Sequence, residues 1–384
     1  MRILVAHQVP RQRTGGMSRI MGFIHDRVAA AGHTADYFCA DDVPARRGGW
    51  VRRHLTFPLL IRRHAIEAAR SGKPYDIVNV HEPCALAIAA WKRSAGNPMV
   101  VVTSHGLERR AWDLAKEELR LGREGPPLKT RLTYPLSGLW PAEAALKRAD
   151  HIFCLNSEDR DYLVTRFGRR AETVTRIYPA ADQMYACAAS SRDYRSVERV
   201  LFAGTWRKNK GIEDLVPAFT ALARLYSDLR LVVLGAGVPN HIVQHSFPDW
   251  VRPRVECQAP EDEFGMAAAF AAADVFLLPS LFEGTPLTLM QAMMSGLPIV
   301  TTATCGMKDV IRHRDNGILV PTRAPEAIAS AVGSLIADPA WRERLGRAAQ
   351  ADAGARYTWD RVARPVTDVY EALVGRRSQW REDL

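Results

Sequence analysis

The sequence predicts an α/β fold made of two doubly wound domains, on three observations. A chain of 384 residues is longer than one ordinary hydrophobic core organises, so two domains are expected. Short apolar runs of strand length alternate with longer stretches of helical periodicity, which is the pattern of parallel βαβ units. Each half also opens with an apolar strand, a glycine-bearing loop and a helix, as the first unit of such a sheet does.

The composition is that of a globular protein whose first half is basic. Hydrophobic residues make up 47% of the chain and charged residues 24%. Residues 1–187 hold 29 Lys and Arg against 19 Asp and Glu, and the remainder holds 23 against 23, so the whole net charge of +10 belongs to the first half. This asymmetry suggests an anionic partner: a membrane surface, a phosphorylated acceptor or nucleic acid. No recognised nucleic-acid motif supports the last of these, so no nucleic-acid partner is expected.

Signals for export and for disulfides are missing from the sequence. No apolar run is long enough to span a bilayer, and Met1 leads directly into a strand, so we expect a cytoplasmic protein. The six cysteines are scattered singly, without a C-x-x-C pair or a histidine at metal-ligand spacing. This pattern favours reduced thiols over a disulfide framework or a zinc site.

The first βα unit comprises a strand at residues 2–7, a loop with Gly15 and Gly16, and a helix over residues 17–31. A glycine pair at this turn lets the backbone approach a phosphate, and a merely flexible turn explains it equally well. The full G-x-G-x-x-G pattern is missing, so no dinucleotide cofactor is predicted.

Residues 44–73 place cationic clusters on both sides of an apolar stretch. One interpretation is an interfacial helix that lies in a lipid headgroup layer. The candidate membrane-contacting residues are Trp50, Arg52, Arg53, Arg62 and Arg63. The alternative is a solvated helix that packs its leucines into the core, and Pro58 is expected to interrupt a helix here.

Strands at residues 76–81 and 99–103 bring His81 and His105 to the carboxyl ends of the sheet, where open α/β sheets bind ligands. The long charged stretch from Leu107 to Pro141 has little periodicity and predicts an acceptor-binding excursion, partly helical around Trp112 to Leu121.

A strand at 149–155 follows, and then a helix capped by Asn156. The aperiodic stretch 180–195 is predicted to link the two domains.

The second domain opens with a strand at residues 199–203 and a loop that contains Gly204, Thr205, Arg207 and Lys210. A strand, a basic glycine-bearing loop and a helix start form an anion site in which the two cations grip phosphates. The alternative is two solvated cations on a turn.

Residues 274–302 are predicted to form a strand, a loop, a helix and a second strand. Thr285 suits the N-cap of the helix and Pro286 its first position, which leaves the next three amides without intrahelical acceptors. These amides favour an anion such as a diphosphate. The residues expected around the ligand are Glu283, Gly284, Thr285, Leu287, Thr288, Leu289 and Gln291.

The same stretch resembles the E-x7-E signature of family 4 retaining glycosyltransferases, which have the GT-B fold. The resemblance rests on Glu283-Gly284, a polar residue eight positions after Glu283, and Gly296-Leu-Pro-Ile-Val300. It implies two Rossmann-like domains that face a central cleft. The expected domains are 1–185, completed by a returning helix at 359–384, and 196–358.

By this resemblance the protein moves a hexosyl group from UDP- or GDP-hexose to a glycan or lipid-linked acceptor with retention, as in cell-surface glycan synthesis. Glu283 would contact the sugar, His105 would lie beside it, and the Gly15-Gly16 loop would face the diphosphate. Lys210 and Arg207 would stabilise the leaving diphosphate. His81 and Trp112 are the acceptor-site candidates in the first domain.

Three positions depart from the family pattern, with Gln291 at the second Glu, Pro286 at a Gly and Thr205 at an Arg. An amide still bonds ribose hydroxyls, but it lacks the charge. No D-x-D pattern is evident in the cleft-forming loops, so neither a metal nor a cofactor is expected.

The alternatives are a non-catalytic nucleotide-sugar binder and a GT-B nucleotide-sugar epimerase. The basic first half suits peripheral attachment to the inner membrane face.

Overall fold

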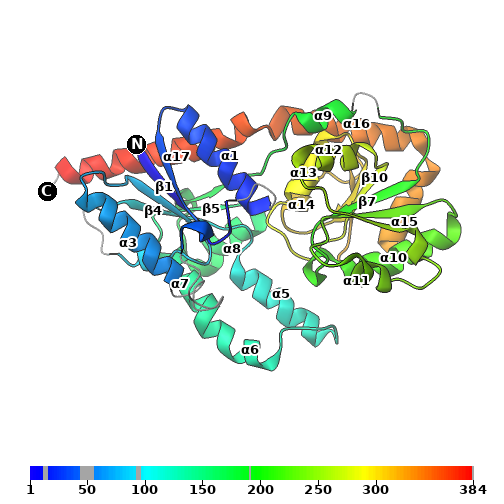
Figure 1. Cartoon of the computed structure of the whole chain (residues 1–384), viewed down its shortest axis with the longest axis horizontal. Coiled ribbons are helices and arrows are strands. Elements are labelled where there is room, and N and C mark those ends of the chain that lie inside the picture. The colour runs from blue at the N-terminus through cyan, green and yellow to red at the C-terminus, as the bar shows by residue number, and fades with distance from the viewer. Residues whose placement is uncertain (12–15, 44–55, 92–96, 190–191, 383–384) are drawn as a thin grey trace. The chain divides into compact units, whose positions relative to one another are not determined.

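The structure, a computed structural model, describes residues 1–11, 16–43, 56–91, 97–189 and 192–382. The chain forms two compact units, unit 1 from Met1–Ile177 with Val362–Leu384 and unit 2 from Tyr178–Arg361. Each unit holds a six-stranded sheet with helices packed on it (Figure 1). The paired strands run parallel in both sheets, so the predicted α/β, doubly wound fold is confirmed.

The sheet of unit 1 has the strand order β2-β1-β3-β4-β5-β6. Its strands are β1 (Arg2–Ala6), β2 (Thr34–Phe38), β3 (Ile77–His81), β4 (Met99–Thr103), β5 (His151–Cys154) and β6 (Val174–Arg176). Every residue of β3 and β4 is buried, as expected of central parallel strands covered on both faces. The chain runs outward from β1 to β2 and returns to β3 on the other side of β1. The direction in which successive strands are added to the sheet therefore reverses between the carboxyl ends of β1 and β3. We call this place the reversal point of the sheet.

Helices cover this sheet and extend beyond it. They are α1 (Gly16–Ala30), α3 (Phe57–Arg70), α4 (Leu86–Ala89), α5 (Glu108–Arg120), α6 (Leu128–Tyr134), the π-helical turn η3 (Pro135–Leu139), α7 (Trp140–Arg148) and α8 (Ser157–Phe167). The side chain of Asn156 caps α8 by accepting from the amide of Asp159 at 2.7 Å, as predicted.

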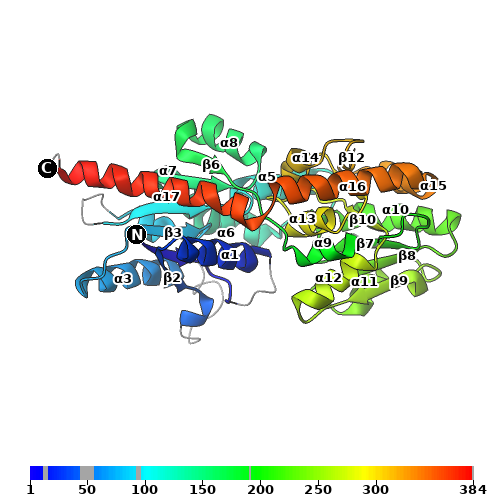
Figure 2. The ribbon, with the colours of Figure 1, turned by 90° about the horizontal axis from the view of Figure 1, so that it is seen from above.

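The last helix of the chain, α17 (Trp359–Glu382), belongs to unit 1 from Val362 onward and runs along it (Figure 2). The side-chain amide of Asn79 on β3 donates to the hydroxyl of Tyr370 at 2.7 Å. Arg377 donates to the backbone carbonyl of Asp76 at 3.2 Å. The C-terminal helix is therefore part of the fold that supports β3.

The sheet of unit 2 has the order β12-β11-β10-β7-β8-β9. Its strands are β7 (Arg199–Ala203), β8 (Arg230–Leu234), β9 (Val255–Gln258), β10 (Val275–Leu278), β11 (Ile299–Thr302) and β12 (Ile318–Val320). The helices are α9 (Met184–Ala189), α10 (Ile212–Leu225), α11 (Asn240–His245), α12 (Glu263–Ala271), α13 (Leu287–Met294), α14 (Cys305–Val310), α15 (Pro325–Ala337) and α16 (Pro339–Arg356). After β9 the chain returns to β10 beside β7, so this sheet reverses between the carboxyl ends of β7 and β10. Ligands of doubly wound sheets bind at such reversal points.

Three local predictions differ from the structure. The stretch 107–141 is more helical than predicted, because α6 and η3 follow α5, which is the helix expected around Trp112 to Leu121. Pro58 does not interrupt a helix but lies in the first turn of α3, where the missing N–H is no loss. The predicted linker 180–195 contains α9, which packs in unit 2 through the fully buried Tyr185. The boundary between the units lies at residues 177 and 178.

Over the described residues, no helix combines the length and the apolar content that crossing a bilayer requires.

Candidate functional site

The loops that follow β7 and β10 are tied together at the reversal point of unit 2. The carbonyl of Asn209 accepts from the amides of Leu281 at 2.8 Å and Phe282 at 3.3 Å. Gly211, at the start of α10, has φ = 72°, and a Cβ there would overlap the carbonyl oxygen of Pro279. Only glycine lets the two loops approach this closely.

This close approach brings Lys210 and Glu283 into contact. The ammonium of Lys210 donates to Oε1 of Glu283, and the hydroxyl of Ser280 donates to the same oxygen at 2.9 Å. The two charged side chains are only 17% and 12% exposed. The stem of Lys210 lies beside Gly204, 3.6 Å from the position of an added Cβ, so a larger side chain would crowd it. A partly buried cation and carboxylate therefore lie at the strand edge where ligands bind.

Helix α13 begins one residue later than predicted. Its N-cap is Pro286, with an extended backbone (ψ = 129°), and Leu287 is its first helical residue. The amide of Leu289 donates to the carbonyl of Pro286 at 3.1 Å. The amide of Leu289 is therefore already hydrogen-bonded. Of the three amides predicted to bind an anion, those of Leu287 and Thr288 remain.

The turn before α13 is supported from behind by α14. The amide of Gly306 donates to the carbonyl of Gly284 at 2.9 Å. A Cβ on Gly306 would overlap the hydroxyl of Thr285, which is 4% exposed. These contacts hold the turn that carries Glu283 in one conformation.

The structure separates the two cations of the loop after β7. Arg207 is exposed at the N-cap of the short 3₁₀ turn Lys208–Lys210, while Lys210 reaches Glu283. Thr205 is half-buried, and its methyl group lies 3.6 Å from the position of an added Cβ on Gly237.

Gln291 is 1% exposed and engages neighbours on two other helices. Its side-chain nitrogen donates to the hydroxyl of Tyr185 at 2.7 Å and lies 3.5 Å from a carboxylate oxygen of Glu263. Tyr185 in turn donates to the same carboxylate. The carbonyl oxygen of Gln291 is buried without a hydrogen-bond partner among the described residues. The carbonyl oxygen of Gln291 can therefore still accept a hydrogen bond, and it lies near the carboxylate of Glu263. The two groups together suit a ligand that donates from two hydroxyls.

Three histidines gather at the reversal point of unit 1. Nδ1 of His81 and Nε2 of His105 lie 2.5 Å apart with their rings stacked, and the ring of His7 lies 6.3 Å from that of His81. Burial lowers the pKa of His7 and of His105 to about 4, and it lowers the pKa of His81 well below its usual value. The cluster is therefore neutral at neutral pH.

Nδ1 of His7 accepts from the amide of Val9 at 3.2 Å, so Nε2 carries the proton of the neutral ring. This Nε2 is buried without a hydrogen-bond partner in the described part of the chain.

A buried acidic group lies next to the histidines. Glu82 follows His81 directly and is 8% exposed; burial and the nearby carboxylate of Glu108 raise its pKa to about 8. The hydroxyl of Tyr134 donates to Glu108, and the ring of Trp112 lies 5.1 Å from that of Tyr134. Trp112 is 8% exposed and packs α5 against α6.

The remaining predicted residues lie apart from these clusters or outside the described residues. Gly15, Trp50, Arg52 and Arg53 are outside the described residues, and Gly16 is the first residue of α1.

Arg62 lies 5.7 Å from the ring of Trp91, and Arg63 pairs with Glu67 at 2.7 Å on the surface. Phe57, Ile61 and Ala65 are buried, so α3 packs its apolar face into the core.

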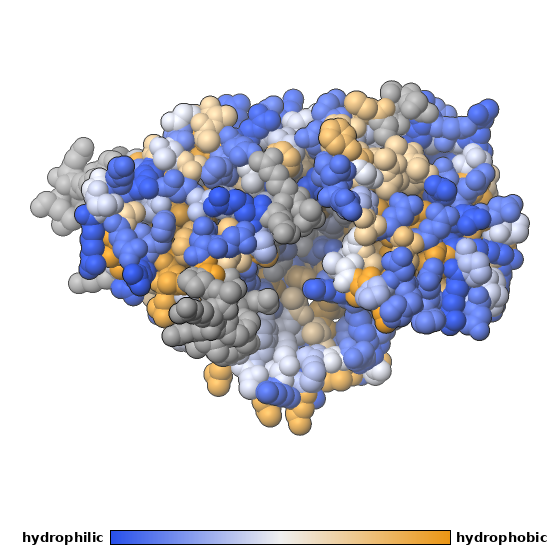
Figure 3. Space-filling model, viewed as in Figure 1, coloured by the Kyte–Doolittle hydropathy of each residue, from blue (hydrophilic) through white to orange (hydrophobic). Residues whose placement is uncertain are grey.

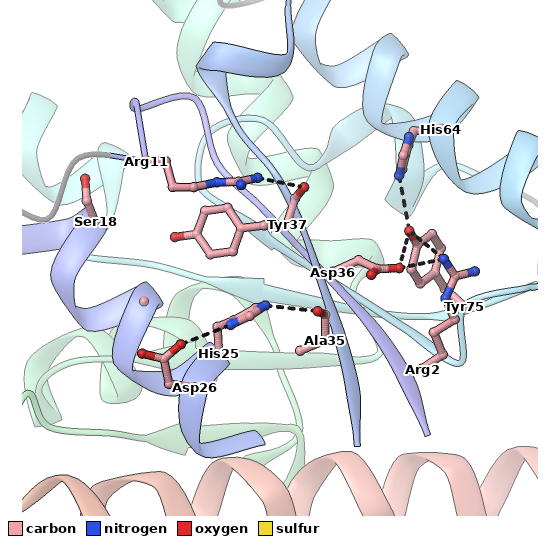
Figure 4. Close-up of a pocket in the computed structure, with 11 residues that line it drawn as sticks. Arg2, Arg11, Ser18, His25, Asp26, Ala35, Asp36, Tyr37, His64 and Tyr75 are labelled. Carbon is pink, nitrogen blue, oxygen red and sulfur yellow. Dashed lines mark hydrogen bonds and ion pairs between the residues drawn. The ribbon is translucent and has the colours of Figure 1, made fainter. Parts of the chain in front are cut away.

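A polar pocket of about 750 Å³ opens beside the edge strand β2 (Figure 4). Arg2 pairs with Asp36 at 2.6 Å, and Tyr75 donates to the same carboxylate at 2.9 Å. The charges of Arg2 and Asp36 are thus satisfied within the fold, and these contacts tie β1, β2 and the chain before β3 together. The lining also includes Tyr37, whose ring lies 4.9 Å from that of His7 at the reversal point.

No group of three or more His, Cys, Asp or Glu side chains is placed to hold a metal ion within the ranges that the structure describes.

Several residues of these clusters were not singled out from the sequence, among them His7, Glu82, Tyr185 and Glu263. His7 and Glu82 follow strands, so the strand-end rule that selected His81 would have found them. Tyr185 and Glu263 lie far from Gln291 in the sequence, and no local pattern joins them.

Two family models match the chain, "Glycosyltransferase Family 4" over residues 14–183 and "Glycosyl transferases group 1" over residues 197–338. A D-inositol 3-phosphate glycosyltransferase from Salinispora tropica is 26% identical over 82% of this chain and 67% of its own length. Two other curated relatives are matched over only 44% and 43% of their own length, whereas a phosphatidyl-myo-inositol mannosyltransferase from Mycobacterium leprae, 26% identical, is matched over 74% of its length and 78% of this chain.

Among solved structures, the sucrose-phosphate synthase from Thermosynechococcus elongatus is similar with a TM-score of 0.75 and 21% identity, covering 97% of this chain and 99% of that one. Anabaena Alr3699/HepE, solved in complex with UDP-glucose, is similar with a TM-score of 0.69 and 14% identity, covering 97% and 100%. At these identities the likeness shows the fold.

Proposed function

Because this chain is a glycosyltransferase with the GT-B fold, we propose that it transfers a hexosyl group from a nucleotide-diphosphate sugar to an acceptor hydroxyl with retention. The contact of Lys210 with Glu283 at the reversal point of unit 2 is the observation that carries this proposal. It puts one cation and one carboxylate at the place where such a sheet binds its ligand.

Lys210 has the task of stabilising the leaving diphosphate. Negative charge develops on the leaving group, and a preorganised cation in a partly buried site stabilises it more than water does. The amides of Leu287 and Thr288 at the start of α13 favour the same anion. Arg207, exposed on the same loop, adds positive charge around the phosphates.

Glu283 accepts hydrogen bonds from the sugar hydroxyls in this proposal, and Ser280 and Lys210 hold its carboxylate in place. The buried carbonyl of Gln291 accepts from a ribose hydroxyl. The donor is a UDP- or GDP-hexose; a UDP-sugar agrees with the UDP-glucose complex of the Anabaena relative.

We propose that the acceptor is a glycan or a lipid-linked molecule of cell-surface synthesis and that it binds to unit 1. His81 and Trp112 are proposed to contact the acceptor. His105 is proposed to contact the donor sugar. The positive charge excess of residues 1–187 suits an anionic acceptor or membrane. Because Lys210 neutralises the leaving group, the reaction is proposed to need neither a divalent metal nor a cofactor.

The test combines ligand stabilisation with product analysis. UDP- and GDP-hexoses are screened for a rise in melting temperature, since a ligand bound only by the native state stabilises it. Turnover with the stabilising donor is then followed with and without a chelator, and the anomeric configuration of the product is read by NMR. Stabilisation without turnover points to a non-catalytic binder, and an epimeric nucleotide sugar points to an epimerase.

Lys208 supplies a matched control, because it lies in the same 3₁₀ turn and pairs with Glu213 at 2.9 Å. Lys210→Ala should lower kcat/KM by at least about 100-fold, as the loss of a transition-state charge partner does. Lys208→Ala should change it by less than about threefold. Equal effects of the two substitutions would contradict the assigned role of Lys210.

A further inference from the structure

The helical excursion of unit 1 carries apolar side chains on two opposite faces. On the inner face, the ring of Tyr134 packs against Gly138, where a Cβ would overlap it, and Leu139 is fully buried. The outer face carries four large apolar side chains, which we name the outer stripe. They are Leu128, Leu132, Leu136 and Trp140, which are 65%, 70%, 77% and 57% exposed.

The outer stripe is aligned by the shape of the helix. Its residues are four apart, whereas an α-helix turns once in about 3.6 residues, so a four-residue spacing drifts around the axis. The π-helical turn η3 lies between α6 and α7, and a π turn holds about one residue more than an α turn. This extra residue offsets the drift and keeps Trp140 in line with Leu128.

The charged residues within the stretch that carries the outer stripe are positive, and the nearest carboxylates in the sequence, Glu124 and Glu143, lie beyond its two ends. Between Gly125 and Ala142 the sequence has no Asp or Glu, and its charged residues are Lys129 and Arg131. Both are exposed, and neither forms an ion pair with another described residue. At about 100° per residue they lie on opposite flanks of the stripe. Large exposed apolar side chains flanked by cations are typical of helices that lie in a lipid headgroup layer.

The arrangement stands out in unit 1 (Figures 1 and 3). Helices α5 and α6 project away from the sheet, and apolar side chains protrude beside hydrophilic ones where α6 is labelled. A soluble helix normally buries its one apolar face, so a second apolar face without cover indicates a partner.

We propose that the outer stripe docks unit 1 onto an anionic membrane surface, with its leucines and tryptophan in the headgroup layer and Lys129 and Arg131 on lipid phosphates. This deepens the acceptor side of the proposed function and rests on it for the lipid-linked acceptor. It concerns a different helix from α3, which buries Phe57 and Ile61 but leaves Leu59 59% exposed.

Vesicle sedimentation tests the proposal. The probes are vesicles of phosphatidylglycerol with phosphatidylcholine, and vesicles of phosphatidylcholine alone. Wild type should bind the anionic vesicles, less so as salt is raised. The double variant Leu132→Asp/Leu136→Asp should lower the bound fraction by at least about tenfold, since it puts charge where apolar side chains insert. Lys129→Glu/Arg131→Glu should lower it on anionic vesicles in particular.

The matched control is Leu225→Asp, at the end of α10 in unit 2, because Leu225 is 76% exposed outside the stripe. It should leave binding unchanged. All of these side chains are exposed, so the variants should keep the wild-type melting temperature.

Three outcomes would overturn the proposal. The first is wild type that does not bind anionic vesicles, and the second is a stripe variant that binds as well as wild type. The third is a wild-type dimer that the stripe variant dissociates in the absence of lipid, which would make the stripe an interface between two copies. Stabilisation by nucleotide sugar is measured on the same variants and should not change, so failure here is distinct from failure of the donor assignment.

Discussion

At the scale of single residues, the environment of Gln291 changes what its substitution should do. From the family pattern alone, a Glu at this position would be expected to tighten nucleotide binding or leave it unaltered. The structure places Gln291 1% exposed and 3.5 Å from a carboxylate oxygen of Glu263. Two carboxylates that close inside a protein cannot both ionise without a cost.

We therefore expect Gln291→Glu to destabilise the protein by on the order of 2 kcal/mol, because it removes the donor to Tyr185 and introduces a like charge. The loss should grow as pH rises and the second carboxyl ionises. Thermal unfolding at several pH values measures it. The exchanged pair Gln291→Glu/Glu263→Gln restores one amide and one carboxylate, so it should recover most of the loss. Equal destabilisation of single and double variants would show that the two side chains do not interact.

Glu82 gives a second prediction at this scale. Burial and Glu108 raise its pKa to about 8 in the folded protein, so the folded state binds a proton that the unfolded state releases above its ordinary value near 4.5. This contribution to stability is fully present below about pH 4.5 and is lost as pH rises through 8. Glu82→Gln, which mimics the protonated form, should gain on the order of 4 kcal/mol relative to wild type between these pH values. Denaturant unfolding across the pH range measures the difference; a constant difference would mean that Glu82 ionises normally.

At the scale of elements, the turn between β7 and α10 depends on one glycine. Gly211 combines a positive φ of 72° with contact against the carbonyl of Pro279. Gly235, after β8, has a φ of 69° and open space around it. Substitution of Gly235 measures the cost of the positive φ alone, whereas substitution of Gly211 adds the cost of the contact with Pro279.

Gly235→Ala should lower the free energy of unfolding by about 1 kcal/mol, which is the energy of holding an alanine in the left-handed backbone conformation. Gly211→Ala should cost several times more, because a backbone oxygen has to move, and it should weaken donor binding by separating Lys210 from Glu283. Unfolding free energies and nucleotide-sugar titration measure both effects. Similar costs for the two variants would show that the β7 and β10 loops are not held together by close packing.

At the scale of the whole molecule, the C-terminal helix α17 packs on unit 1, which is formed otherwise by the first 177 residues. Tyr370 is fully buried and accepts from Asn79 on β3, so the stability of unit 1 depends on the last helix. Tyr370→Ala should cost about 3 to 5 kcal/mol, as other large core truncations do. Hydrogen exchange should show faster exchange in β3 and β4, while β10 and α13 of unit 2 keep their protection. Equal loss of protection in both units would contradict this division of the chain.

The sequence by itself determined most of the strands and the alternation of strands with helices, although not β2 and β9, because apolar periodicity and glycine-bearing turns are local properties. It predicted the doubly wound class and the Asn156 cap, and it placed Lys210, Glu283, His81 and His105 at strand ends. It missed the helices α6 and α9, whose apolar residues face two directions or a neighbouring helix, so their periodicity is weak.

Only the tertiary structure decided which of these residues meet. Lys210 pairs with Glu283 because β10 returns to lie beside β7, and Gln291 meets Tyr185 and Glu263 because three helices pack together. The outer stripe, likewise, is visible only once the opposite face of its helix is known to be buried. Contacts between residues far apart in the sequence depend on strand order and packing, and neither is written in a local pattern.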